Sequence, residues 1–239
     1  MDVTKVANGG EDLAVRREVP PGAEREVAAL YWEAFGRKLG PALNPPDAGR
    51  AFIAAHLHHD RGLTVLRGGR VVGVAGYQLG GRALTGGRAR DVLAAYGPVR
   101  GLPRLAVLAL FERAPAPGEL VMDGIAVAAE QRGAGIGSLL LREIAAVAAE
   151  HHCRRVRLDV IDVNPRARAL YERHGFTAVR TRRTPYLRGL LGFGAVTTMH
   201  RRVVAADANA TGGERVRPAG RADRVDPAAP AGRRLQQGE

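Results

Sequence analysis

A glycine-rich turn between an apolar strand and an amphipathic helix is the first feature of this 239-residue chain that could do chemistry. Residues 120–127 are apolar enough for a strand, and the helix after the turn repeats its apolar residues every three or four positions. Glycines at such a junction let several backbone N–H groups point to one place, where the helix dipole also favours negative charge. The turn therefore predicts a site for a phosphate or pyrophosphate group.

Three phosphate-binding motifs can be separated by spacing. A Walker loop ends in Gly-Lys-Ser/Thr, but Ser138 follows Gly137 and the turn contains no lysine. A dinucleotide fingerprint that begins at Gly133 needs a glycine at position 138, which is a serine. The pattern that fits is Arg-x-x-Gly-x-Gly, formed by Arg132, Gly135 and Gly137. It resembles the pyrophosphate-binding signature of the GNAT-type N-acetyltransferase superfamily.

The second signature of the same superfamily follows at the expected distance. It consists of an Asn, an Ala three residues later, a Leu-Tyr pair and a closing Gly-Phe. In this chain these residues are Asn164, Ala167, Leu170, Tyr171, Gly175 and Phe176. Asn164 can cap the helix that begins here, and Gly175 suits its end. Tight packing is an alternative explanation for a glycine-rich turn that occurs alone. Two signatures in the expected order favour a cofactor site.

The resemblance implies acetyl-coenzyme A (acetyl-CoA) as cosubstrate. It places the pyrophosphate on the loop amides and the pantetheine and acetyl group along the preceding strand. The cofactor-binding residues expected on this basis are Ile125, Ala126, Val127, Arg132, Gly133, Ala134, Gly135, Ile136, Gly137, Ser138, Asn164 and Arg168. No metal is expected: only His56 and His59 of the nearby histidines share a helix face, and the single Cys153 excludes a multi-cysteine site.

Tyr171 is the candidate general acid. An amine that attacks a thioester must arrive neutral, and the departing thiolate gains from a proton donor. The superfamily's general acid is the Tyr of the second signature, which corresponds to Tyr171. The pKa of a free Tyr is about 10, above the value of about 8.5 for a cysteine-like thiol, so a strong hydrogen bond is an alternative to full proton transfer. The plainer alternative is a buried aromatic on a helix face.

Asp123 is the candidate general base, because in the superfamily this strand often carries a base that acts directly or through water. Strict alternation would put Asp123 on the same face as Ile125 and Val127. An Asp that only orients a neighbouring loop is the alternative.

The resemblance also implies that the first two helices wall the acceptor pocket. Substrate contacts are therefore expected at Tyr31, Trp32 and Glu33, although the aromatics of this helix also fit the core.

The elements that must position these residues indicate an α/β (α+β) chain, and the resemblance implies the GNAT-type acyltransferase fold. That fold is a mixed central sheet with splayed strands flanked by helices. Besides the two signature regions, the patterns predict helices at 22–39, 47–59, 89–96 and 102–113, a hairpin of strands at 63–66 and 71–79, and strands at 13–19, 178–183 and 195–203. The 80–118 connection is the largest departure from the superfamily, and it can roof or narrow the acceptor pocket.

Composition limits the remaining possibilities. We expect one acetyltransferase domain at 11–203, with disordered segments at 1–10 and 204–239. No apolar run could span a bilayer and residues 1–10 lack a signal-peptide core, so a cytoplasmic protein without a membrane partner is expected. The net charge of +12 suits a polyanionic cosubstrate, and a homodimer is left open.

The expected function is transfer of acetyl from acetyl-CoA to a primary amine of a small molecule or peptide. One alternative is a basic nucleic-acid-associated protein, but the chain has no helix-turn-helix, zinc or stacking-aromatic motif, and aromatics are only 5% of residues. A nucleic-acid partner is therefore not expected. The other alternative is a non-catalytic module that binds acyl-CoA, against which Tyr171 argues.

Overall fold

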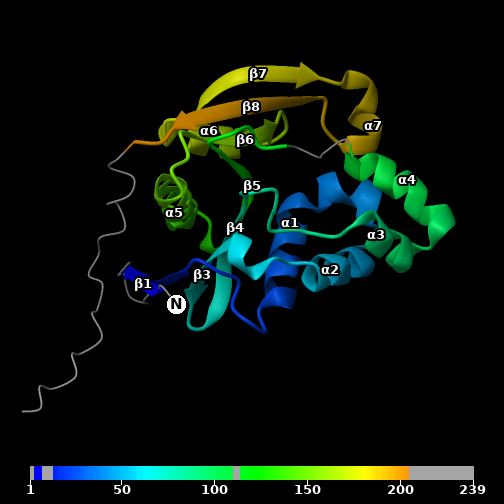
Figure 1. Cartoon of the computed structure of the whole chain (residues 1–239), viewed down its shortest axis with the longest axis horizontal. Coiled ribbons are helices and arrows are strands. Elements are labelled where there is room, and N and C mark those ends of the chain that lie inside the picture. The colour runs from blue at the N-terminus through cyan, green and yellow to red at the C-terminus, as the bar shows by residue number, and fades with distance from the viewer. Residues whose placement is uncertain (1–2, 7–12, 110–113, 205–239) are drawn as a thin grey trace, which may run out of the picture.

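A mixed sheet runs through the molecule in the order β1-β2-β3-β4-β5-β6-β8-β7 (Figure 1). The computed structural model describes residues 3–6, 13–109 and 114–204. The strands in these residues are β1 (Val3–Val6), β2 (Leu13–Arg16), β3 (Gly62–Arg67), β4 (Arg70–Gln78), β5 (Glu119–Val127), β6 (Arg155–Ile161), β7 (Thr177–Arg183) and β8 (Ala195–Arg202). The β5–β6 pair is parallel, and the other neighbouring pairs are antiparallel.

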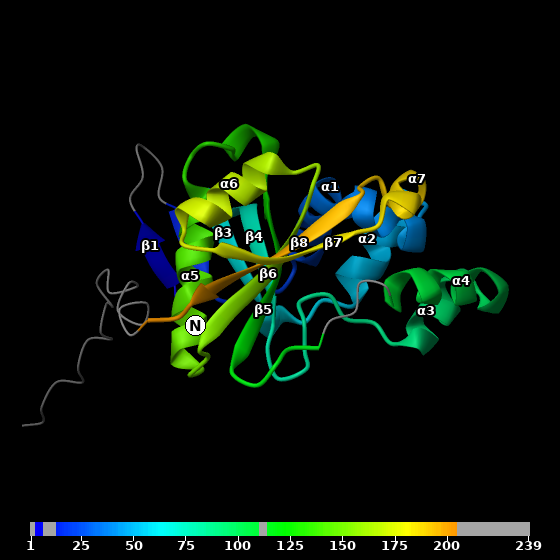
Figure 2. The ribbon, with the colours of Figure 1, turned by 90° about the horizontal axis from the view of Figure 1, so that it is seen from above.

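Helices cover both faces of the sheet (Figure 2). They are α1 (Glu24–Leu43), α2 (Pro46–Ala55), α3 (Ala89–Tyr96), α4 (Pro98–Ala109), α5 (Ile136–Glu150), α6 (Pro165–Arg173) and α7 (Arg188–Leu191). Leu140 and Ile144 of α5 join a core with the strands and α6, whereas Val27 and Leu30 of α1 join a second core with α2. The apolar period of each helix therefore buries one face, and the two cores lie on opposite sides of the sheet.

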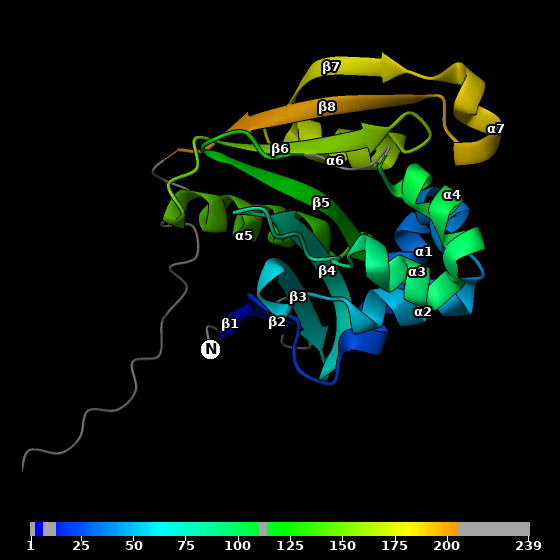
Figure 3. The ribbon, with the colours of Figure 1, turned by 45° about the vertical axis from the view of Figure 1, so that its right-hand side comes forward.

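The β5 and β6 strands are hydrogen-bonded only where they begin. Their register pairs are Glu119↔Arg155, Leu120↔Val156 and Val121↔Arg157, after which the strands separate (Figure 3). From Met122 onward, the edge of β5 that faces β6 is not paired with it. This opening confirms the splayed mixed sheet expected from the sequence, and it lies between the two predicted signature regions.

Several element boundaries differ from the sequence predictions. Residues 1–10 were expected to be disordered, but Val3–Val6 forms β1 and pairs with β2. The helix predicted at 22–39 continues through Pro41 to Leu43, because Pro41 lies in the last turn and the buried Ala42 and Leu43 anchor that turn in the core. The second helix ends at Ala55 rather than near residue 59. The predicted tail at 205–239 and the end of the 102–113 helix lie outside the described residues.

A buried carboxylate closes the paired end of β5 and β6. The Glu119 side chain is inaccessible to solvent and lies 2.8 Å from Arg155 Nε and 3.0 Å from Arg157 Nη1. The amide of Ala116 also donates to it at 3.1 Å. Burial acts to raise the pKa of Glu119, but the hydrogen bonds from Arg155 and Ala116 and the charge of Arg157 outweigh it and lower the pKa.

Glu119→Gln should lower the free energy of unfolding at neutral pH by about 2 kcal/mol, because it leaves two arginines without their buried partner. A lowered pKa in the folded state means that this stabilisation is complete above the unfolded pKa of about 4.3 and is lost as the pH falls through the folded value. Urea unfolding at neutral and acidic pH measures both effects. Glu172→Gln, which removes a half-exposed ion pair with Arg168, is the control and should cost at most about 0.5 kcal/mol. Equal losses of unfolding free energy in the two variants would contradict the stabilising role given to the buried Glu119.

Candidate active site

The glycine-rich turn forms the start of α5. A short 3-10 turn, Ala129–Gln131, leads from β5 into the loop, and α5 begins at Ile136. Gly133 and Gly135 have φ values of +89° and +80°, which residues with a Cβ rarely adopt. Among the described residues, no side chain caps the start of α5. A Cβ added to Gly133 or to Gly135 would have no atom of the described residues within 4 Å. An uncapped helix start beside open space fits a bound pyrophosphate.

The two signature regions meet in space. An added Cβ on Gly137 would lie 3.0 Å from Cδ2 of Leu170, so the first turn of α5 packs closely on α6. The Ser138 hydroxyl lies 2.9 Å from Nε2 of His174, the residue that follows α6. Burial lowers the pKa of His174, and the charge of Arg142 lowers it further. Gly137 and Ser138 therefore have structural partners of their own besides their predicted cofactor role.

Arg132 connects the loop to two other elements. Its Nη2 donates to Glu33 Oε1 of α1 at 2.7 Å, and its Nε donates to the carbonyl of Val127 at 3.2 Å. Both side chains of the ion pair are about half exposed, so the pair adds at most about 1 kcal/mol. Glu33, expected at the substrate, is thus placed beside the glycine-rich loop.

A β-bulge changes the faces of β5. The register passes from Gly76↔Gly124 to Tyr77↔Met122, which leaves Asp123 with no residue opposite it on β4. Ile125 and Val127 consequently pack with the α5 core, as Met122 does. Asp123 lies on the other face, where its buried Oδ2 is 3.4 Å from a Cβ added to Gly76. The prediction that alternation places Asp123 with Ile125 and Val127 is wrong, because the bulge inserts one residue.

The bulge puts Asp123 on the face of the sheet that α1 and α2 cover. These are the helices that the resemblance assigns to the acceptor pocket. The backbone of Ile125, Ala126 and Val127 pairs with β4 on one side, and its other edge faces the opening toward β6. The carboxylate is thus on the face that α1 and α2 cover, and the expected cofactor strand is open at its edge. This arrangement suits a base that receives a proton from an incoming amine.

The start of α6 confirms the predicted cap. Asn164 Oδ1 accepts a hydrogen bond from the amide of Ala167 at 3.1 Å, and Pro165 occupies the first turn. The half-exposed Arg168 donates to Glu172 at 2.9 Å, one turn further along the helix. The cofactor contacts of Asn164 and Arg168 stay predictions.

Tyr171 lies on the inner side of α6. It is only 6% exposed, and its ring centroid is 5.9 Å from that of Phe176. Burial raises the pKa of Tyr171 to about 12, so the hydroxyl remains protonated at neutral pH and is a donor rather than a base. Full proton transfer to a thiolate of pKa about 8.5 would be uphill by about 5 kcal/mol. For the predicted role of Tyr171 as the acid, the raised pKa suits a hydrogen bond to developing negative charge better than complete transfer.

The two aromatic residues expected at the substrate are placed between helices. Tyr31 is 6% exposed and belongs to the core shared by α1 and α2. Trp32 packs against Gly49 of α2, where an added Cβ would lie 2.5 Å from its Cη2. Phe35, four residues after Tyr31 on α1, contacts β5, and its ring lies on Gly124. The helical spacing from Tyr31 was the available signal for Phe35.

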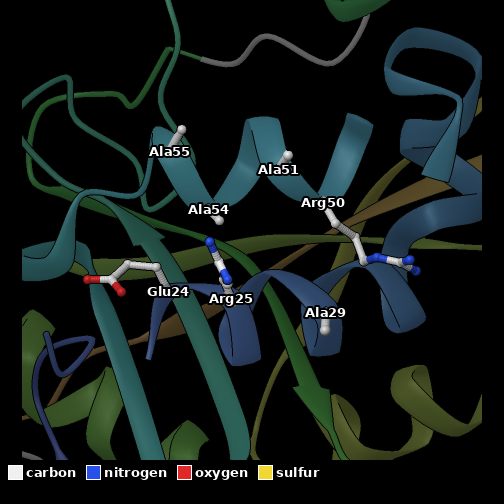
Figure 4. Close-up of a pocket in the computed structure, with 7 residues that line it drawn as sticks. All are labelled: Glu24, Arg25, Ala29, Arg50, Ala51, Ala54 and Ala55. Atoms are coloured by element: carbon white, nitrogen blue, oxygen red, sulfur yellow. The ribbon is translucent and has the colours of Figure 1, made fainter. Parts of the chain in front are cut away.

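A cavity of about 620 Å³ lies between α1 and α2 (Figure 4). It is lined by Glu24, Arg25, Ala29, Arg50, Ala51, Ala54 and Ala55. None of these is a predicted site residue.

Within residues 3–6, 13–109 and 114–204, no helix is long and apolar enough to cross a membrane. In the same residues, no group of three or more His, Cys, Asp or Glu side chains could hold a metal ion.

Comparison with known proteins agrees with this geometry. The family described as "Acetyltransferase (GNAT) family" matches residues 25–176. A thialysine N-epsilon-acetyltransferase from Bos taurus is 41% identical over 56 residues, which are 23% of this chain and 33% of that enzyme. The match thus spans about a third of that relative's length.

Solved structures share the fold. An acetyltransferase structure covers 80% of this chain and 99% of its own, with 23% identity and a TM-score of 0.51. A GCN5-related N-acetyltransferase from Kribbella flavida covers 80% and 97%, with 16% identity and a TM-score of 0.54. Because the family match covers more than half of the residues, the chain belongs to the GNAT family of N-acetyltransferases.

Proposed function

We propose that this enzyme transfers the acetyl group of acetyl-CoA to a primary amine of a small molecule or a peptide, and that residues 11–203 form the catalytic domain. The observation that carries the proposal is the uncapped, glycine-rich start of α5 beside the open edge of β5. Among the described residues, the strand pairing of β5 beyond Val121 is with β4 and not with β6. The Val127 carbonyl accepts a hydrogen bond from Arg132, and the rest of the β6 side of this strand is available to an extended ligand.

The glycine-rich loop, the end of β5, Asp123 and Tyr171 each have a role in the proposed transfer. The amides from Gly133 to Ser138 bind the pyrophosphate, and the backbone of Ile125 to Val127 hydrogen-bonds the pantetheine. Asp123 accepts the proton of the attacking amine, directly or through water. Tyr171 donates a hydrogen bond to the sulfur as negative charge develops on it. Acetyl-CoA supplies the thioester.

The relative with the name thialysine N-epsilon-acetyltransferase supports an amine acceptor. Thialysine is an amino acid whose side chain ends in a primary amine. Such an amine is cationic at neutral pH and must lose a proton before it attacks. In the proposed mechanism, the carboxylate of Asp123 receives that proton.

Release of free thiol from acetyl-CoA tests the proposal. The panel contains lysine, thialysine, polyamines, aminoglycosides and short peptides, and mass spectrometry identifies the acetylated product. At least one amine is expected to raise the rate well above that with acetyl-CoA alone. If acetyl-CoA binds and no amine raises the rate, the chain is a binding module rather than a transferase.

A further inference from the structure

Phe35 is the α1 side chain that meets β5 at its bulge. A Cβ added to Gly124 would lie 2.8 Å from Cε1 and 3.2 Å from Cε2 of Phe35, and closer still to Cζ. No side chain could therefore occupy position 124 while the ring stays in place. The tip of the ring lies directly on the β5 backbone.

If the proposed function is correct, the acyl end of the bound acyl-CoA lies at Gly124. A cofactor held at the start of α5 and along Ile125 to Val127 extends toward the beginning of β5. The next residues in that direction are Gly124 and Asp123, the candidate base, at the bulge. Beyond them the opening closes, because Val121 pairs with β6. In the proposed complex the reacting carbonyl lies near Asp123, and its acyl chain extends toward the α1 face, where the Phe35 ring lies on Gly124.

The ring of Phe35 is held firmly in this position. Its centroid is 4.5 Å from that of Tyr31, with the two ring planes tilted by 50°. Tyr31 is itself buried in the core of α1 and α2 and packs against the Phe35 ring. Phe35 is only partly buried, however, so part of its ring remains available for contact with a ligand.

We infer that Phe35 sets the length of the acyl chain that the enzyme accepts. The ring leaves room for the methyl of an acetyl group and collides with the additional carbons of a propionyl or butyryl group. Phe35 is thus a specificity-determining residue for the acyl donor. The inference rests on the proposed function, because it needs the acyl group to be bound at Gly124.

Phe35→Ala tests the inference through a ratio of rates. Thiol release is measured with acetyl-, propionyl- and butyryl-CoA and one amine acceptor. The wild type should prefer acetyl-CoA. In the variant, the butyryl-to-acetyl ratio of kcat/KM should rise at least about tenfold, since one methylene changes discrimination by about 10-fold to 200-fold. A side chain that only packs α1 on the sheet would lower all three rates together, and an unchanged ratio would overturn the inference.

Phe52→Ala is the matched control. Phe52 belongs to the same core, but its ring lies at Gly87 and Tyr96 rather than on β5. This variant should lose melting temperature and keep the acetyl preference, and an equal shift in its ratio would contradict a specific role for Phe35. Phe35→Leu is a milder replacement that should shift the ratio in the same direction if Phe35→Ala does not fold. A wild type that releases no thiol with any donor would contradict the proposed function itself, whereas an active wild type with a constant ratio contradicts only the role of Phe35.

Discussion

Tyr171→Phe is expected to lower the turnover number about a hundredfold and leave the affinity for acetyl-CoA nearly unchanged. The hydroxyl acts on charge that appears only as the carbon–sulfur bond breaks, so its loss raises the transition state relative to the bound state by about 3 kcal/mol. Because burial raises the pKa of Tyr171 to about 12, activity should also not fall through pH 9 to 10 from ionisation of this residue. Steady-state kinetics with the best acceptor, under conditions where chemistry limits the rate, provides the measurement.

The packing alternative gives a different result. Phe keeps the ring beside Phe176, so a purely structural Tyr171 would be replaced with almost no change in turnover. Tyr96→Phe is the control, because its hydroxyl donates to the carbonyl of Leu43 at 2.7 Å in the α3 region. That variant should lose some stability and keep its turnover number. Full activity in Tyr171→Phe would assign the role of the acid to water.

Local signals in the sequence predicted the glycine-rich turn before α5 and the helix cap at Asn164. Both features depend on residues within one turn of chain, and the structure contains both. The splayed strands followed from the resemblance carried by these signatures. The cofactor and substrate contacts themselves stay predictions.

The face of Asp123 could not be predicted, because a bulge depends on the pairing of β5 with β4, whose residues are about fifty positions away. The alternation of side chains assumes an unbroken register. One inserted residue moves every side chain beyond it to the opposite face of the sheet. For a similar reason, the spacing of Tyr31 and Phe35 along α1 does not show that Phe35 reaches Gly124. Gly124 has no side chain, which allows that contact, and it lies 89 positions after Phe35 in the sequence.

Gly135→Val is expected to weaken binding of acetyl-CoA at least about tenfold. At a φ of +80°, a β-branched residue is strained, so the loop shifts and its amides no longer point to one place. Open space surrounds this position, so no clash with the core is added. The melting temperature should consequently fall by only a few degrees.

Gly81→Val separates strain from binding. Gly81 has a φ of +78° and equally open surroundings, but it follows the far end of β4. The two variants should lose similar stability, and only Gly135→Val should lose affinity for acetyl-CoA. Equal losses of affinity would show that strain anywhere in the chain is sufficient.

Calorimetric titration of the folded Gly135→Val protein with acetyl-CoA, beside the wild type, tests most directly whether the glycine-rich loop is the pyrophosphate site. We predict one saturable site in the wild type and at least tenfold weaker binding in the variant, with circular dichroism unchanged. Equal affinity in the two folded proteins would contradict the assignment of the loop and, with it, the position given to the acyl group at Gly124.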